Sequence, residues 1–301
     1  MTTRTNNSST QSKPLIVGGV PEHFNLPWHL AIESGAFSDQ GVSIEFRDIP
    51  GGTGAMTRGL RENELDIAVV LSEGGVADLL NGNPSRIVKT YVESPLIWGI
   101  HVAADSEIKT IDQINGSRIA ISRFGSGSHL MAIVDAAERN WPTADMKFEK
   151  IGNLTGARKA LAGGEADTFF WERFTTAPYV QSGEFRRIGE RLTLWPAFIV
   201  CVRNDVLQGR HDDVKTVLEV VNQAAIDLMA NDNACEMISG RYGIRLDDVK
   251  EWFSKTKWSS DFNEPVEAIK NIKTYLLRLG LIDEEQATSN ELWYDLDFQK
   301  S

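Results

Sequence analysis

The chain has 301 residues, of which 42% are hydrophobic and 24% are charged, so it can form two domains with the composition of an ordinary globular protein. Its 42 acidic and 31 basic residues give a formal net charge of −11, which argues against nucleic acid and anionic membrane surfaces as partners. No apolar run reaches the roughly 18 residues of a membrane-spanning helix, so we expect no membrane insertion.

The N-terminal residues and the cysteines bear on localisation and cofactors. The first stretch, "MTTRTNNSSTQSK" (1–13), is polar, and we expect a disordered tail there. It lacks the apolar stretch of roughly 7–15 residues that a secretory signal contains, so we expect a cytoplasmic protein unless a leader has been removed. Cys201 and Cys235 lie too far apart in the sequence for the closely spaced cysteine pair of a metal site. The sequence does not decide whether they form a disulfide. We predict no metal and no other cofactor.

Residues 14–71 alternate between strand and helix patterns. Short apolar or alternating runs predict strands, and segments that open with Asn, Pro or Gly predict helices. The strands are expected at 14–20, 42–49 and 66–71, and the helices at 25–37 and 51–63. This β-α-β-α-β order predicts a parallel sheet with right-handed crossovers.

The same order recurs about one hundred residues later. Strands are expected at 117–122, 146–151 and 167–171, and helices at 127–140 and 155–165. The motif "LRENELD" (60–66) recurs 101 positions later as "LAGGEAD" (161–167), with its Leu, Glu and Asp unchanged. The pair "AI" at 31–32 recurs at 132–133 with the same offset. We infer two similar α/β lobes.

Two further β-rich segments, 87–105 and 192–205, follow the third strand of each lobe and are well placed to connect the lobes. From about residue 212 the pattern is helical, and we expect these helices to pack around the first lobe or to brace the junction. The predicted division is lobe I at 14–96 and 199–301, and lobe II at 97–198.

The stretch "GAFSDQGVSIEFRDIPGGTGAMTRGLRENELDIAVV" (35–70) resembles the sulfonate-, taurine- and nitrate-binding proteins and the related thiamine-pyrimidine proteins. The shared pattern is a helix ending in G-x-F, a short strand, a Gly-rich loop, and a helix ending in G/N-E-x-D. "IKTIDQINGSRIAIS" (108–122) resembles the start of the second lobe in that family. The resemblance covers roughly residues 14–205. It implies the type II periplasmic-binding-protein fold, in which two α/β lobes with two hinge crossings hold one ligand in a central cleft.

Two departures from the family pattern matter. Members that serve transporters carry an export signal, which is not seen here, so the chain resembles a leaderless intracellular branch. The fungal pyrimidine-synthase relatives carry closely spaced cysteines in an iron motif, and Cys201 and Cys235 alone do not supply one. This departure counts against synthase chemistry of that type.

In open parallel sheets, ligands bind beyond the carboxyl ends of the strands. That rule selects six loops, which would line one cleft if the lobes face each other: 21–25, 51–54, 72–75, 123–129, 152–156 and 171–174. The candidate ligand contacts on these loops and on the two crossings are His23, Phe24, Thr53, Ser72, Glu73, Tyr91, Ser126, Ser128, His129, Trp171, Glu172 and Trp195. No residue is assigned a catalytic or metal-binding role.

Each candidate also has a structural interpretation. The segment "GSGSH" (125–129) opens a helix, so its serines either bind a ligand or only cap that helix. It lacks the Lys–Ser/Thr pair that follows the glycines of a phosphate-binding loop, and it does not match the G-x-S-x-G motif around the nucleophile of a hydrolase. Trp171 either stacks on a ligand ring or packs in the lobe core, and Phe24 either contacts the ligand or packs against its helix. Tyr91 and Trp195 either wall the cleft or stiffen the hinge.

The loops carry hydroxyls and carboxylates, from Glu22, Glu73 and Glu172, with Arg123 and Arg173 as the nearby cations. This mixture favours a polar aromatic ligand with amino groups, and an aminopyrimidine of the thiamine-precursor type is the leading hypothesis. Three alternatives stay open. The first is an anion-binding protein of the sulfonate, taurine or nitrate type for an ABC transporter. The second is an enzyme on the same scaffold, of the pyrimidine-precursor synthesis type, with His23, Glu73, His129 and Glu172 as acids or bases. The third is a sensor whose closed form binds another protein.

Overall fold

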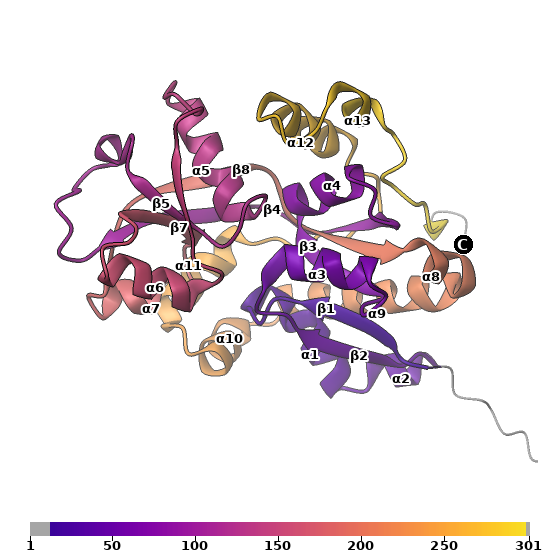
Figure 1. Cartoon of the computed structure of the whole chain (residues 1–301). Helices are drawn as coiled ribbons and strands as arrows, with labels where there is room; N and C mark the ends of the chain where they lie inside the picture. Colours follow the sequence, from indigo (N-terminus) through magenta and orange to yellow (C-terminus); the bar gives the residue numbers. More distant parts are fainter. Residues whose placement is uncertain (1–12, 299–301) are drawn as a thin grey trace, which may run out of the picture.

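One eight-stranded sheet runs through the whole molecule, in the order β2-β1-β3-β8-β4-β7-β5-β6. The computed structural model describes residues 13–298, so the predicted tail lies, apart from Lys13, outside the described residues. Figure 1 shows a lobe at each end of this sheet, with β4 and β8 passing between them. The fold is α/β with two lobes, as the sequence predicts.

Lobe I is built around three parallel strands, with β1 pairing β2 on one side and β3 on the other. Its strands and helices, in chain order, are β1 (Leu15–Gly19), η1 (His23–Asn25), α1 (Leu26–Glu33), α2 (Ala36–Asp39), β2 (Ile44–Asp48), α3 (Gly52–Arg61), β3 (Ile67–Leu71) and α4 (Ser72–Leu80). The helix predicted at 25–37 is divided, because Gly35 adopts a left-handed φ of 78° between α1 and α2.

Lobe II repeats this arrangement, with β5 pairing β6 and β7 in parallel. Its elements are η2 (Ile111–Ile114), β5 (Arg118–Ile121), α5 (Gly127–Glu138), β6 (Lys147–Lys150), α6 (Leu154–Ala162), β7 (Thr168–Glu172) and α7 (Ala177–Gln181). The two long strands β4 (Ser85–Ala103) and β8 (Phe185–Arg203) pair antiparallel with each other and belong to both lobes. The predicted lobe boundaries at 96/97 and 198/199 fall within these strands and stay a prediction.

The repeated sequence motif has a physical cause at the junction between a helix and the third strand of each lobe. Asp66 accepts a hydrogen bond from Ile16 N at 2.8 Å, and Asp167 accepts one from Arg118 N at 2.7 Å. Asn63 and Gly164, which are 101 positions apart, both adopt a left-handed φ. The Asp is needed in both lobes because it satisfies a backbone donor of the first strand that the sheet leaves unpaired.

The C-terminal part is helical, and it contacts both lobes. Its helices are α8 (Asn204–Gly209), α9 (His211–Met229), α10 (Ala234–Tyr242), α11 (Leu246–Lys255), α12 (Val266–Arg278) and α13 (Glu284–Thr288). Helix α9 packs on α1, and α12 packs on α4 (Figure 1). Helix α11 reaches lobe II, where Glu251 pairs with Arg173 at 2.7 Å, and Tyr275 of α12 donates a hydrogen bond to Glu138 of α5 at 2.7 Å.

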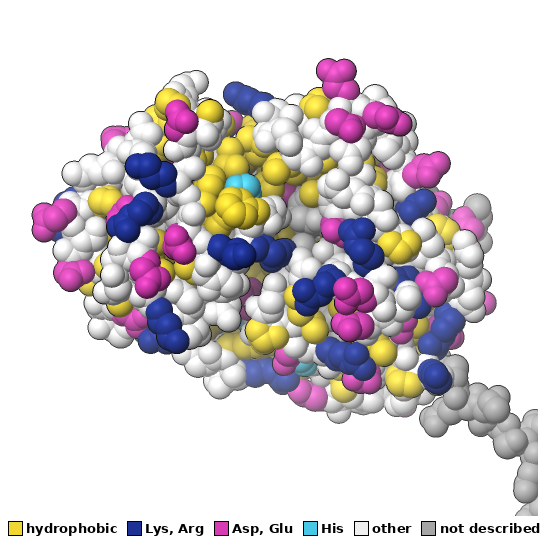
Figure 2. All heavy atoms as spheres, viewed as in Figure 1, with side chains coloured by type: hydrophobic (Ala, Val, Ile, Leu, Met, Phe, Trp, Pro, Cys, Tyr) yellow, Lys and Arg dark blue, Asp and Glu magenta, His cyan; other side chains and the backbone are white. Residues whose placement is uncertain are grey.

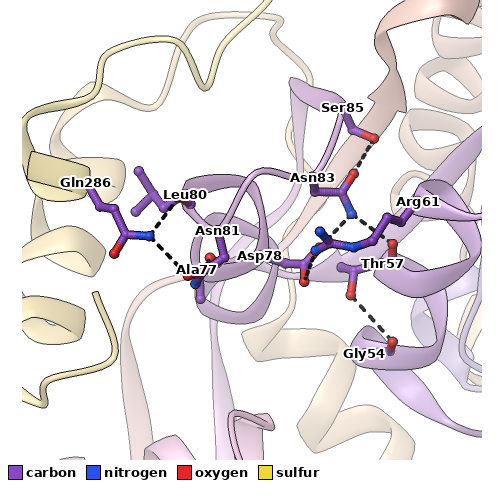
Figure 3. Close-up of polar contacts among 10 residues, drawn as sticks. All are labelled: Gly54, Thr57, Arg61, Ala77, Asp78, Leu80, Asn81, Asn83, Ser85 and Gln286. Atoms are coloured by element: carbon purple, nitrogen blue, oxygen red, sulfur yellow. Dashed lines mark hydrogen bonds and ion pairs between the residues drawn. The ribbon is translucent and has the colours of Figure 1, made fainter. Parts of the chain in front are cut away.

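A cluster of polar side chains holds the C-terminal part of α4 against both α13 and α3 (Figure 3). Gln286 donates to Leu80 O and to Asn81 Oδ1, both at 3.0 Å, so α13 caps the C-terminal end of α4. Asn83, which is buried, donates to Thr57 O at 2.8 Å and to Asp78 Oδ2. Such buried amides need partners for every polar atom, so the cluster fixes the position of this end of lobe I.

Cys201 is buried on β8, and both cysteines are free thiols. Among the described residues, no helix combines the length and the apolar character needed to cross a membrane.

Candidate ligand-binding cleft between the lobes

A cavity of about 310 Å³ lies between the two lobes. Its wall includes the segments after β1 and β2, the start of α3 and the end of β3 in lobe I, and the starts of α5 and α6 and the end of β7 in lobe II. Figure 2 shows hydrophobic and basic side chains gathered at the junction of the lobes, where the surface is hollowed. The volume suits a small organic molecule, at the lower end of the range for ligand pockets.

The apolar part of the wall is formed by Leu71, Leu96, Trp98, Trp171 and Phe198. Trp98 and Glu172 are directly opposite each other on β4 and β7, so an indole and a carboxyl project side by side from the same face of the sheet. Trp171 stays partly exposed at the wall. Flat apolar walls of this kind suit a planar ligand.

Hydroxyl groups line the wall, and each also stabilises the backbone. Ser126 is the N-cap of α5 and accepts from His129 N, while Ser128 Oγ accepts from Ser122 N at 3.0 Å. Thr53 Oγ1 accepts from Leu71 N at 3.0 Å. Ser126 Oγ and Ser128 Oγ also lie 3.0 Å apart, so one of these two hydroxyls donates to the other. Thr53 keeps its hydrogen for a ligand.

Two carboxyl groups, one from each lobe, line the same cavity. Glu22 follows β1, and Glu172 is the last residue of β7. Burial and, to a smaller extent, the charge of Glu172 raise the pKa of Glu22 to about 8. Burial also raises the pKa of Glu172, although Thr175 N and Oγ1 donate to its Oε2 at 2.6 and 2.8 Å and favour the charged form.

Arg123 crosses the cleft from the loop after β5. Its Nη1 lies 3.5 Å from Gly51 O at the start of α3. A Cβ atom added to Gly54 would lie 1.9 Å from the Arg123 Nη2, so the guanidinium rests against a backbone position that only glycine leaves open. Burial lowers the pKa of this arginine. Arg123 therefore joins the two lobes at the edge of the cavity.

The structure brings five of the predicted contacts together in the cavity wall: Thr53, Ser126, Ser128, Trp171 and Glu172. Glu22, which the sequence analysis considered only as part of the loop's charge, joins them. Its signal was its position in the loop 21–25, which the strand-end rule selected.

The other predicted contacts lie behind this wall and have protein partners. His23 and Phe24 pack against Trp252, with the His23 and Trp252 ring centroids 4.1 Å apart, and burial lowers the pKa of His23 to about 3. Tyr91 donates to Phe24 O at 2.9 Å. His129 accepts from Gly125 N through Nδ1 at 3.1 Å, and it packs against Phe124 and Phe148.

The hinge holds the remaining three. Ser72 Oγ donates to Pro196 O at 2.6 Å, and Trp195 Nε1 donates to Glu73 Oε2 at 2.8 Å. Burial raises the pKa of Glu73 to about 7. Of the four candidate acid–base residues, His23, Glu73, His129 and Glu172, only Glu172 is in the cavity wall. The described residues contain no cluster of three or more His, Cys, Asp or Glu that could hold a metal ion.

Comparison with known proteins identifies the fold that forms this cleft. A family model described as "Ca3427-like PBP" matches residues 98–191, which lie mostly in lobe II. The structure of the Candida albicans CA3427 gene product, described as having the generic periplasmic binding protein structural fold, is 29% identical and has a TM-score of 0.86. The alignment covers 96% of this chain and 99% of that one. The chain has the periplasmic-binding-protein fold.

More distant structures share this fold. The alkanesulfonate-binding protein SsuA from Xanthomonas axonopodis pv. citri, bound to MOPS, is 15% identical with a TM-score of 0.74, over 90% of this chain and 94% of that one. The nitrate-binding protein NrtA from Synechocystis PCC 6803 is 15% identical with a TM-score of 0.69, over 91% of this chain and 84% of that one. The search of curated proteins gave no match. The predicted resemblance to type II periplasmic-binding proteins is confirmed.

Proposed function

We propose that the protein binds a small, flat, polar molecule that carries nitrogen, and that its two lobes close around it. An aminopyrimidine of the thiamine-precursor type is the leading ligand. The observation that carries this proposal is the composition of the cavity wall, where the indoles of Trp98 and Trp171 stand beside the carboxyls of Glu22 and Glu172. Aromatic faces stack on a planar ring, and carboxyls accept hydrogen bonds from its amino groups.

The two hinge strands support closure as the mechanism. Because β4 and β8 run through both lobes, a change in their bend rotates one lobe against the other. Their pairing has register shifts between Val92 and Ile97, where the strands pass the cavity. A ligand that contacts both lobes then stabilises the closed state. A protein that recognises this closed state, such as an ABC transporter or a regulatory partner, is the proposed macromolecular partner.

An anion-binding function is the second candidate, and a specific observation favours it. The first turns of three helices, α3, α5 and α6, are in the cavity wall, together with Arg123. Free backbone N–H groups at helix N-termini attract anions, and an arginine adds a charged donor. Against it stand the two carboxyls of the same wall, which repel a bare anion such as sulfonate or nitrate.

The test is titration calorimetry with 4-aminopyrimidine, taurine and nitrate on the purified chain and on Trp171→Ala. We expect 4-aminopyrimidine to bind, and the variant to bind it roughly 10- to 100-fold more weakly, because a stacking surface is lost. Trp141→Ala is the matched control, since Trp141 is in the same lobe but not in the cavity wall. Selective binding of taurine or nitrate would support the anion candidate instead. Mass spectrometry of the ligand after incubation tests whether it is turned over.

A further inference from the structure

The wall of the cavity between the lobes carries two carboxyl groups and one guanidinium. Its charged residues are Glu22, Arg123 and Glu172. No Lys, Arg or His within residues 13–298 forms an ion pair with either carboxyl, whereas other acidic groups, such as Asp135 with Arg191, are paired. Arg173, the neighbour of Glu172 in sequence, pairs instead with Glu190 and Glu251 at 2.6 and 2.7 Å. Neither cavity carboxyl therefore forms an ion pair of its own, although the charge of Arg173 acts on Glu172 and favours its charged form.

The geometry of Glu172 prepares it to accept hydrogen bonds from a planar group. Thr175 holds one of its oxygens through a backbone N–H and a hydroxyl, which fixes the plane of the carboxyl. The indole of Trp98 lies beside it on the neighbouring strand. A carboxyl next to an aromatic face is the combination that binds planar cations, by charge-assisted hydrogen bonds at the edge and by cation–π attraction at the face.

We infer that the cavity takes its ligand as a planar cation, a protonated amidine or aminated nitrogen ring, whose N–H groups bridge Glu22 of lobe I and Glu172 of lobe II. This inference rests on the proposed function and names the charge state of the ligand. Closure brings a carboxyl from each lobe toward the other, and the charge of Glu172 keeps the proton on Glu22 unless a cation lies between them. A cation between them offsets that charge, so the charge of the ligand is coupled to closure.

The affinity for an amidine, which stays protonated between pH 6 and 8, depends on pH in a definite direction. Burial holds the pKa of Glu22 at about 8, so below pH 8 this carboxyl carries a proton that a bound cation displaces. Binding therefore releases a proton, and the affinity rises as the pH approaches 8. Glu172 acts in the same direction, and Arg123, the other charged group of the wall, stays protonated throughout. A neutral ligand that accepts a hydrogen bond from protonated Glu22 would show the opposite trend.

The test uses benzamidine, a planar cation, and benzamide, its neutral isostere, in titration calorimetry on the full chain between pH 6 and 8. We expect benzamidine to bind at least about tenfold more tightly than benzamide at pH 8, and its affinity to fall toward pH 6. Glu22→Gln and Glu172→Gln should each lose about tenfold in benzamidine affinity while binding benzamide as the wild type does. Glu62→Gln, on the exposed end of α3, removes the same charge away from the cavity and should change neither affinity.

Thermal melts of the variants check that they fold, and Glu22→Gln should be at least as stable as the wild type because it removes a like-charge contact. The inference is overturned if benzamide binds as tightly as benzamidine, if benzamidine does not bind at any pH, or if its affinity is unchanged in both variants. Weak or absent binding of benzamidine would not contradict the proposed ligand-binding function itself. That function is tested separately by the binding of 4-aminopyrimidine to the wild type and to Trp171→Ala.

Discussion

In both lobes an aspartate before the third strand accepts a hydrogen bond from the first strand. The two lobes differ in the residues at the end of the third strand. Strand β3 ends at Leu71, and the next residues, Ser72 and Glu73, turn into the hinge, where they bond Pro196 and Trp195. Strand β7, 101 positions later, ends at Glu172, whose carboxyl lines the cavity. The residues that the two lobes share support the fold, whereas those that differ decide what the cavity can bind.

Glycines 54 and 156 give the sharpest contrast between the lobes, since both belong to the repeated "TGA" at the start of a helix. A Cβ at Gly156 would lie 1.8 Å from the backbone oxygen of Ile151, whereas a Cβ at Gly54 would meet only the flexible end of Arg123. We expect Gly156→Ala to lower the free energy of unfolding by about 2–4 kcal/mol, because the backbone must move. Gly54→Ala should change it by less than about 1 kcal/mol.

Urea denaturation of both variants measures this difference. Gly54→Ala should still weaken ligand binding, because the displaced Arg123 no longer rests against α3. Equal destabilisation by the two substitutions would contradict the contrast between a rigid neighbour in lobe II and a movable one in lobe I.

The buried carboxyl of Glu73 has no counterpart in lobe II, where Phe174 is at the equivalent position. Burial raises the pKa of Glu73 from 4.5 to about 7, so the folded state binds a proton that the unfolded state releases between these pH values. Stability from this group is therefore fully present below pH 4.5 and is lost as the pH rises to about 7. Glu73→Gln keeps an acceptor for Trp195 but cannot ionise.

We expect the free energy of unfolding of the wild type, relative to Glu73→Gln, to fall by on the order of 3 kcal/mol between pH 5 and pH 8. Urea denaturation at several pH values measures this change, and subtracting the variant cancels the contributions of His23 and the cavity carboxyls. Glu62→Gln should show no such pH dependence of the difference. A difference that stays flat with pH would mean that Glu73 is ionised in the hinge.

Much of the fold could be predicted from the sequence, because the 3.6- and 2-residue periods and the offset of 101 residues depend on local patterns. The strand-end rule also led to Thr53, Ser126 and Trp171, which are in the cavity wall. That rule gives the end of a strand but not the direction of the next side chain. Helix α4 begins immediately at Ser72, so its first turn directs Glu73 toward the hinge, whereas an extended Glu22 stays at the cavity.

The C-terminal helices could be predicted as helices, but the residues that they contact could not. Their position depends on pairs that are far apart in sequence, such as Arg173 with Glu251 and Tyr275 with Glu138. No repeat or period connects the members of these pairs. The sequence therefore left open whether these helices pack around lobe I or brace the junction, and α11 and α12 contact lobe II.

The junction aspartates provide the finest comparison, since they make the same backbone hydrogen bond in the two lobes. The Asp66 side chain is 18% exposed and lies near Arg203, and the Asp167 side chain is 30% exposed and pairs with Arg118. Replacing either by Ala leaves a strand N–H without its acceptor. We expect a loss of about 1–2 kcal/mol for Asp66→Ala and about 1 kcal/mol or less for Asp167→Ala, because water replaces the lost partner more easily at the more exposed site.

The double variant should be additive to within about 0.5 kcal/mol in urea denaturation, since the two sites share no partner. If Asp167→Ala cost more than Asp66→Ala, the ion pair with Arg118 would matter more than burial, and the two junctions would not be physically equivalent. If neither substitution lowered the free energy of unfolding, the hydrogen bond to the strand N–H would not explain why an aspartate occupies this position in both lobes.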